Sequence, residues 1–349
     1  MSASLPRDID AAAQPAPGDG PKRASAKEII VAIPTLNEAE HIDACLRSLM
    51  AGDPRLADIK FVVADGGSND GTQAIVQELA KDLENVRLLH NPKRVQAAAI
   101  NQVASEAVDA DHTILVRCDA HALYPPGYVT QIADSLINRD AASVVVCMDA
   151  VGTTCFQKAN AWIVDTPLGS GGSAHRGGSK SMYTDHGHHA GFRLEAFRAL
   201  GGYDETFTHN EDAEFDQRLI ASGRKIWLDA TIRHDYVPRG TVRALAKQYF
   251  NYGKGRARNI LKHRTRPKFR QLAPVCVILA LAGSAILSVL TPAFLALPAL
   301  YALLLIAASV YVAISKRSAC GLFSGLAAGT MHIGWGAGFL RQLTQSAWR

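Results

Sequence analysis

The stretch EIIVAIPTLNE, residues 28–38, indicates the class of fold. Its apolar part predicts a buried strand over Glu28–Pro34, and the polar residues after it predict a helix over Ala39–Ala51 with Asn37 as N-cap. The same succession recurs downstream, with strands expected over Ile59–Ala64, Val86–His90 and Thr113–Cys118 and helices over Gly71–Lys81 and Val95–Ala107. This alternation predicts an α/β fold with a parallel sheet and right-handed crossovers.

Polar clusters follow the predicted strands, at Pro34–Glu38, Asp65–Asp70, Asn91–Arg94 and Asp119–His121. In open parallel sheets, ligands bind outside the carboxyl ends of the strands, so these clusters are candidates for one shared binding edge. The sequence has neither the GxGxxG pattern of nicotinamide-binding proteins nor a GxxxxGK[ST] phosphate loop. Both of those nucleotide-binding classes are therefore disfavoured.

The alternation continues less regularly up to residue 261. We predict helices over Tyr128–Asn138, Leu194–Leu200 and Asp212–Ser222, strands over Ser143–Asp149 and Lys225–Asp229, and a basic amphipathic helix over Leu245–Leu261. The stretch Gly169–His189 is rich in Gly, Ser and His and lacks periodicity, which predicts a long functional loop.

The overall composition is that of a folded protein with about two structural units. The chain has 349 residues, of which 48% are hydrophobic and 20% charged, which excludes a disordered chain. Its six cysteines are scattered without a CxxC pair, so a disulfide framework or a zinc ribbon is disfavoured and reduced core thiols are expected. Residues 1–27 are rich in Ala, Pro, Ser and Gly, which predicts a disordered tail and an ordered chain from Lys27 onward.

Charge and hydropathy divide the chain sharply. No acidic residue follows Asp235, whereas 15 Lys and Arg do, and between Ala273 and Leu340 the charges are Lys316 and Arg317. A membrane span needs ~20 mostly apolar residues, which predicts two to three transmembrane helices in 273–340; the alternative is a buried helical core. The expected spans are Ala273–Thr291, Pro292–Ser315 and, less clearly, Ala319–Leu340.

Two motifs in the first half carry side chains suited to nucleotide and metal binding. In VVADGGSNDGT, residues 62–72, Asp65 could accept hydrogen bonds from a base or ribose, and Asp70 is expected to cap the next helix. In RCDAHALYPPGYV, residues 117–129, Asp119 and His121 follow a strand two residues apart, so both can point into one cleft. A carboxylate and an imidazole could share Mn²⁺ or Mg²⁺.

A third motif, GGYDETFTHNEDAEFDQRL at residues 201–219, places Glu211 and Asp212 before a helix. Paired acids at such a position are often partners of the helix dipole. They also follow a Gly-containing turn, so one of the pair is a candidate general base.

Together these motifs resemble glycosyltransferase family 2, whose members have the GT-A fold, over about Ile29 to Arg256. The stretches LGSGGSAHR (168–176), HGHHAGF and QYFNYGKGRAR further resemble the succinoglycan-type β-1,3-glucosyltransferases of bacterial exopolysaccharide synthesis. The resemblance implies a mixed, Rossmann-like GT-A sheet over 28–240, a basic amphipathic interface segment over 241–272, and then the membrane helices.

The resemblance also assigns site residues. Pro34, Glu38 and Asp65 would hold the uridine, with Lys93 or Arg94 nearby. Asp119 would open a DxD motif whose second acid is replaced here by His121, and His234 is the expected third metal ligand; its alternative is a surface histidine. Asp212 would be the catalytic base, with Glu211, His188, His189 and Gln248 in the acceptor region. The family's QxxRW motif is degraded to QYFNY, and Lys254 and Arg256 would face the diphosphate.

The remaining charged residues suggest two alternative sites. His186, His188 and His189 suggest zinc, but their spacing is unsuited to it, and acceptor contacts or loop packing are preferred. Eight Lys and Arg between Lys254 and Arg270 could bind nucleic acid, but no aromatic stacking platform accompanies them. Placed before a span, they predict a cytoplasmic flank.

The resemblance implies an inverting hexosyltransferase that moves a hexose, with glucose as the expected sugar, from a UDP-sugar to a lipid-diphosphate-linked saccharide, with Mn²⁺ or Mg²⁺ as cofactor. Other polysaccharide-synthesis enzymes are candidate partners, and nucleic acid is not. No apolar signal precedes the catalytic part, so a multi-pass protein of the bacterial inner membrane with a cytoplasmic catalytic domain is expected. The alternatives are a polyprenyl-phosphate glycosyltransferase and a non-catalytic component of a polysaccharide export complex.

Overall fold

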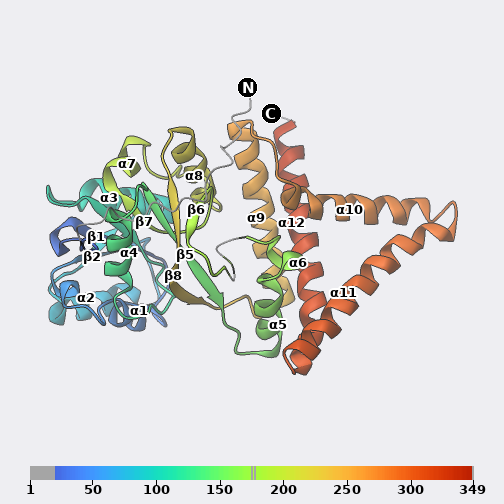
Figure 1. The fold of residues 1–349 in the computed structure, drawn as a ribbon, viewed down its shortest axis with the longest axis horizontal. Coiled ribbons are helices and arrows are strands. Elements are labelled where there is room, and N and C mark those ends of the chain that lie inside the picture. Colours follow the sequence, from blue (N-terminus) through green and yellow to red (C-terminus); the bar gives the residue numbers. More distant parts are fainter. Residues whose placement is uncertain (1–19, 174–175, 177, 348–349) are drawn as a thin grey trace. The chain divides into compact units, whose positions relative to one another are not determined.

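The computed structural model describes residues 20–173, 176 and 178–347, and it divides into two compact units. The first contains the described residues up to Cys147, with Ser179–Thr206 and Glu214–His234. The second contains the described residues from Met148 to Gly178, with Phe207–Ala213 and Asp235 onward. Figure 1 shows the elements of both units.

The first unit is built on a mixed sheet whose described strands have the order β3-β2-β1-β4-β7-β5-β8-β6. Strands β1 to β4 pair with one another in parallel, and β7 then pairs antiparallel with both β4 and β5. The strands are β1 Ile29–Thr35, β2 Lys60–Asp65, β3 Val86–His90, β4 Ile114–Arg117, β5 Ser143–Ala150, β6 Met182–Thr184, β7 His188–Arg193 and β8 Ile226–Tyr236. The expected mixed sheet is thus confirmed.

Helices cover this sheet and bury their apolar faces against it. In α1, Ile42, Cys45, Leu46 and Leu49 are buried, as their spacing of three and four residues predicts. The helices are α1 Ile42–Leu49, α2 Thr72–Asp82, α3 Gln96–Glu106, α4 Tyr128–Ile137, α7 Leu194–Ala199 and α8 Glu211–Ala221, with short turns η1 Ala26–Glu28 and η2 Pro54–Ala57. All six helices fall within a few residues of the predicted ranges.

Two local predictions in this unit were wrong. Asn37 does not cap α1, whose N-cap is His41; instead Asn37 has φ +56° and its side chain accepts a hydrogen bond from the Asn69 amide at 3.0 Å. Asn is one of the residues that tolerate left-handed backbone angles, and here its side chain connects two loops. The predicted loop Gly169–His189 contains β6 and the start of β7, whose few branched apolar residues gave no strand signal.

The N-terminal tail expected over 1–27 lies mostly outside the described residues. Its final part is described and ordered: Ala24 is buried in the core, and its amide donates to Asp134 Oδ1 at 2.7 Å. Arg55 in turn donates to the Ala24 carbonyl at 2.9 Å. The ordered chain therefore begins before Lys27.

The second unit is helical. Its elements are α5 Cys155–Val164, α6 Pro167–Ser170, α9 Val242–His263, α10 Phe269–Leu287, η3 Pro292–Leu295, α11 Ala296–Ser315, η4 Ala319–Phe323 and α12 Ser324–Ala347. Two segments, Phe269–Leu287 and Pro292–Ser315, are long and apolar enough to cross a membrane. They form a hairpin (Figure 1), and large apolar side chains on it are exposed, including Ile286 (72%) and Val289 (87%). Exposed apolar surface of this kind is suited to contact with a membrane or with another protein.

The third expected span, Ala319–Leu340, is different in character. It corresponds to η4 and most of α12, and α12 packs along the basic helix α9 (Figure 1). Ala327, Ala328 and Met331 are buried there. Within the described chain, α12 is not among the helices that are apolar enough to span.

Glycines permit the close packing of α9 against α12. A Cβ atom added at Gly338 would overlap the carbonyl oxygen of Phe250, and one added at Gly253 would overlap that of Trp335. Small residues at such positions let two helix backbones approach closely.

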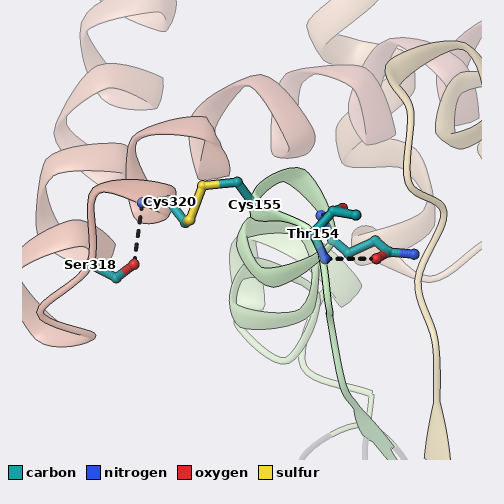
Figure 2. Close-up of a disulfide and its surroundings, with 5 residues drawn as sticks. Thr154, Cys155, Ser318 and Cys320 are labelled. Atoms are coloured by element: carbon teal, nitrogen blue, oxygen red, sulfur yellow. Dashed lines mark hydrogen bonds between the residues drawn. A yellow bond between two sulfur atoms is a disulfide. The ribbon is translucent and has the colours of Figure 1, made fainter.

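A disulfide joins Cys155, at the start of α5, to Cys320 in η4 (Figure 2). The expectation that all six cysteines are reduced core thiols is therefore wrong for this pair. The remaining four are not disulfide-bonded, and Cys45, Cys118 and Cys147 are buried as expected. Two cysteines that are 165 residues apart in the sequence give no spacing signal of their pairing.

We predict that Gly338→Ala and Gly253→Ala each destabilise the protein by about 1–3 kcal/mol, the usual cost of overpacking. The matched control is Gly283→Ala in α10, where an added Cβ meets nothing within 4 Å. The midpoint of thermal unfolding of the detergent-solubilised protein measures the effect. Equal midpoints for all three variants would show that the α9–α12 contact tolerates a separation of the two helices.

Candidate active site

The loops that follow β1 and β2 form one polar edge of the first unit. The strands are in register, with Thr35 opposite Asp65, so both loops leave the sheet at the same level. The two loops are then tied together, because the Asn37 amide donates to Ser68 Oγ at 2.8 Å and the Ala39 amide donates to Asp70 Oδ2 at 3.0 Å. Two of the predicted polar clusters are thus brought together.

Asp65 organises the loop after β2. Its buried carboxylate accepts hydrogen bonds from the amides of Gly67 and Ser68 at 2.9 Å each and from Gln73 Nε2 at 2.8 Å. Asp70 accepts from the amide of Thr72, the first residue of α2, as expected of a capping residue. A loop fixed in this way presents backbone groups in a defined arrangement.

Asp119 lies just past the end of β4, and its carboxylate has several cationic side chains near it. Arg117 Nη2 lies 3.5 Å from Asp119 Oδ1, and Gln96 Nε2 donates to that oxygen at 3.1 Å. Burial raises the pKa of Asp119, but the positive charges of Arg117, His188, His121 and His234 outweigh this and lower the pKa to about 2. The carboxylate is therefore ionised at neutral pH.

Three of the described histidines lie near Asp119 in the structure. Two of them, His121 and His234, are the other predicted metal ligands, and the third is His188. The His188 and His234 rings lie 5.1 Å apart, and His234 is buried. His121 is 61% exposed, and its Nδ1 lies 3.0 Å from Glu38 Oε1. In the part of the chain that the structure describes, no three His, Cys, Asp or Glu side chains are arranged to hold a metal ion.

The cationic residues after β3 have separate environments. Lys93 Nζ lies 2.5 Å from Glu205 Oε2, so its charge is balanced by an acid from the GGYDE motif. Arg94 adopts φ +58°, and its Cα lies against Gly66, where a Cβ atom would come within 3.3 Å. Pro34 is the penultimate residue of β1. Glu205 as a partner of Lys93 was not predicted.

A buried polar chain runs from β7 to Asp119. Asp216 is held by His186 Nδ1 and His189 Nε2, both at 2.7 Å, and His189 Nδ1 lies 2.6 Å from the Tyr203 hydroxyl. Arg117 Nη1 donates to that hydroxyl at 3.3 Å. His186 and His189 thus support packing around Asp216, one of the two roles that were preferred over zinc binding.

The sequence analysis did not predict the roles of Asp216, Tyr203 and Arg117 in this hydrogen-bonded series. A signal was nevertheless present, because Asp216 follows Asp212 by four residues and such pairs lie on the same side of a helix. Tyr203 belongs to the GGYDE motif, and Arg117 precedes Asp119 by two residues on the same strand face.

The remaining predicted residues belong to the second unit. Glu211 and Asp212 open α8, and Asp212 Oδ1 accepts a hydrogen bond from the Ala213 amide at 2.7 Å. Lys254 and Arg256 lie on α9. Gln248, also on α9, donates to the hydroxyls of Tyr236 at 2.9 Å and Tyr252 at 3.2 Å.

Asn210 ties the start of α8 to α9. Its backbone adopts φ +63°, and its side chain donates to the Tyr252 carbonyl at 3.1 Å. The His209 carbonyl and the Asn210 amide lie so close to Gly255 that a Cβ atom there would come within about 3 Å of both. The loop before Asp212 is thereby fixed to the helix that carries Lys254.

Comparisons with known proteins agree with this architecture. Residues 30–201 match the model of "Glycosyl transferase family 2". Over 316 residues, which are 90% of this chain and 94% of the relative, the chain is 42% identical to the succinoglycan biosynthesis protein ExoA of Rhizobium meliloti (strain 1021).

Two more distant proteins are also similar. A Methanococcus voltae dolichyl N-acetyl-alpha-D-glucosaminyl phosphate 3-beta-D-2,3-diacetamido-2,3-dideoxy-beta-D-glucuronosyltransferase is 26% identical over 67% of this chain and 74% of its own length. The solved mannosyltransferase PcManGT from Pyrobaculum calidifontis, in complex with GDP-Man and Mn²⁺, shares the fold with a TM-score of 0.66. It is 19% identical and covers 98% of this chain and 91% of its own.

The sequence motifs, the mixed sheet and the long match to a relative that is 42% identical point to one family. The chain belongs to glycosyl transferase family 2 and is a glycosyltransferase.

Proposed function

We propose that this chain is a membrane-anchored inverting glycosyltransferase of bacterial exopolysaccharide synthesis. It moves a hexose, with glucose as the expected sugar, from a UDP-sugar to a lipid-diphosphate-linked saccharide at the cytoplasmic face of the inner membrane. The observation that carries the proposal is the ionised Asp119 surrounded by Arg117, His121, His188 and His234, in a chain that also has an apolar helical hairpin.

The relatives support the substrate classes. The R. meliloti relative is named for succinoglycan biosynthesis, which favours a polysaccharide precursor as product. The M. voltae relative is named for transfer to a dolichyl-linked N-acetylglucosaminyl phosphate, which favours an acceptor carried by a lipid.

The side-chain types near Asp119 are those that bind a divalent cation, although among the residues described in this structure they are not arranged around one. Asp119, His121 and His234 offer one carboxylate and two imidazoles, and imidazole ligands favour a transition metal such as Mn²⁺ over Mg²⁺. When bound, such an ion would neutralise charge on the departing diphosphate. His121 would exchange its Glu38 contact for this role, which leaves Glu38 available to the nucleotide.

The reaction needs a base and stabilisation of the leaving group. Asp212 accepts the proton of the acceptor hydroxyl, and that oxygen forms a bond to the anomeric carbon as the bond from this carbon to the UDP oxygen breaks. Attack opposite to UDP converts an α-linked donor into a β-linked product. Lys254 and Arg256 stabilise the negative charge that develops on UDP, and Pro34, Asp65 and the Lys93–Arg94 turn hold the nucleoside.

A donor screen with a radiolabelled lipid-linked acceptor tests this proposal. We predict transfer from UDP-glucose into the lipid-linked product, with turnover of Asp212→Asn lower by roughly 10²–10⁴ and UDP binding changed only a few-fold. The reason is that the amide keeps the shape of the carboxylate but is not a base.

The matched control for this screen is Asp111→Asn, a neutralised exposed carboxylate outside the site. Near-normal turnover of Asp212→Asn would remove Asp212 from the mechanism. Sugar found directly on a lipid monophosphate would replace the proposed acceptor with the polyprenyl phosphate itself.

Metal dependence gives a second test. We predict more activity with Mn²⁺ than with Mg²⁺, none with EDTA, and a weakened response to Mn²⁺ in His121→Ala with unchanged thermal stability, because His121 is largely exposed. His41→Ala, another exposed histidine, is the control. Full activity in EDTA would assign the neutralisation of the diphosphate to Lys254 and Arg256 alone.

Membrane topology gives a third test of the proposal. The eight Lys and Arg from Lys254 to Arg270 precede α10, and Lys316 and Arg317 follow α11, so the positive-inside rule places both ends of the hairpin in the cytoplasm. We predict that a reporter fused before Lys27 is active in the cytoplasm, and that one inserted at Leu290 is active in the periplasm. The reverse pattern would contradict this orientation.

A further inference from the structure

Helices α9, α11 and α12 of the second unit enclose a groove with a volume of about 870 Å³. This lies in the upper part of the range of ~300–1,000 Å³ that ligand sites occupy. The walls are almost entirely apolar, with Leu305, Ile306, Leu326 and Ile333 among the lining residues. Lys247 is the charged residue among those that line the groove in the described chain.

The groove is elongated. On α12 its lining extends from Gly325 to Ala337, which at 1.5 Å per residue corresponds to roughly 18 Å. Gly325, Gly329 and Gly334 lie along this path and carry no side chain that could fill it. A long apolar channel of this kind suits an extended hydrocarbon chain better than a compact, polar ligand.

Positive charge is concentrated at one end of the groove. Added Cβ atoms at Gly334 and Gly338 would meet Ala246 and Phe250, so α9 and α12 run parallel and Lys247 lies near the Ala337 end. Lys254 follows two turns later on the same side of α9. Neither lysine forms an ion pair within the described residues, and no acidic residue follows Asp235 in the sequence.

The pKa of His209 is affected by the same two lysines. Its burial lowers its pKa, and the charges of Lys254 and Lys247 lower the pKa further. Two cations near one imidazole make this end of the groove attractive to an anion. The groove thus combines an apolar channel with an anion site at one end, which matches a lipid with a phosphorylated head.

We propose that this groove holds the polyprenyl chain of the lipid-linked acceptor, with the diphosphate of that lipid bound at Lys247. This assignment rests on the proposed function, because it takes the acceptor to be carried on a polyprenyl diphosphate. Bulk phospholipid already has the exposed faces of α10 and α11 to contact, whereas a diphosphate carries more charge than a phosphodiester head and fits the cationic end better.

Binding there would position the acceptor sugar. The groove ends on α9 near Lys247, and Lys254, assigned to the donor diphosphate, lies about 10 Å further along the same helix. A lipid anchored in the groove would therefore present its sugar with a high effective concentration, so that transfer becomes effectively unimolecular.

Photocrosslinking tests the groove without any transfer of sugar. The probe is a polyprenyl diphosphate with a diazirine in its lipid chain, added to the full-length protein in nanodiscs of phosphatidylethanolamine and phosphatidylglycerol. We expect adducts on the α11 and α12 peptides that line the groove, competed by unlabelled polyprenyl diphosphate and not by additional phosphatidylglycerol. Equal competition by phosphatidylglycerol, or labelling spread evenly over α10 and α11, would overturn the assignment.

Two pairs of variants sharpen this test. Ala302→Trp places an indole in the groove, and we expect at least tenfold less labelling; Ala307→Trp, on the same helix and outside the lining, is the control. Lys247→Ala should weaken probe binding several-fold, whereas Arg243→Ala, one turn earlier on α9 and outside the lining, should not. Unchanged labelling of Ala302→Trp would contradict the proposal. The competition on the wild-type protein decides the question if that variant does not fold.

The experiment separates the two proposals. Specific labelling of the groove without transfer from any UDP-sugar would leave the lipid site standing and remove the proposed function. Transfer to a lipid-linked acceptor with non-specific labelling would do the reverse.

Discussion

The ion pair between Arg117 and Asp119 is the interaction on which the catalytic unit depends. A carboxylate in this partly buried position would become protonated if nothing compensated for its loss of water. Arg117 supplies that compensation, and Arg117 is in turn held by Tyr203. Behind Tyr203 stand His189 and Asp216, so that strand β7 and helix α8 both support the charge state of one residue at the end of β4.

This series of hydrogen-bonded side chains explains how a charged carboxylate can lie at the edge of an apolar sheet. Each polar group in it is paired with the next, and satisfied buried networks fix side-chain positions more strongly than isolated contacts do. Outside this network, His121 is 61% exposed, and its Nδ1 lies 3.0 Å from Glu38 Oε1. The unit therefore combines a carboxylate that a buried network supports with a more exposed histidine beside it.

Much of this architecture could be predicted from the sequence, because it depends on local patterns. The apolar run before Pro34, the spacing of Ile42, Cys45, Leu46 and Leu49, and the polar residues at strand ends gave the strands, the helices and the binding edge. Asp119, His121 and His234 were predicted as neighbours, and in the structure both histidines lie close enough to Asp119 to lower its pKa.

What could not be predicted depends on contacts between distant residues. Glu205 pairs with Lys93, and Asp216 with His186 and His189, but none of these pairs has a fixed spacing. Asn37 was misassigned because a capping residue and a residue in a left-handed turn look alike in the sequence. β7 was hidden inside a run of His and Gly whose strand character comes from its neighbours β4 and β5.

The disulfide between Cys155 and Cys320 also restricts how many times the chain crosses a membrane. Two sulfur atoms can bond only if they face the same compartment, so the chain between them must cross an even number of times. That interval contains both apolar segments, Phe269–Leu287 and Pro292–Ser315, and α12 begins only after Cys320. If both segments cross a membrane, the disulfide and the hydropathy agree on an even number of crossings, which a hairpin that enters and returns provides.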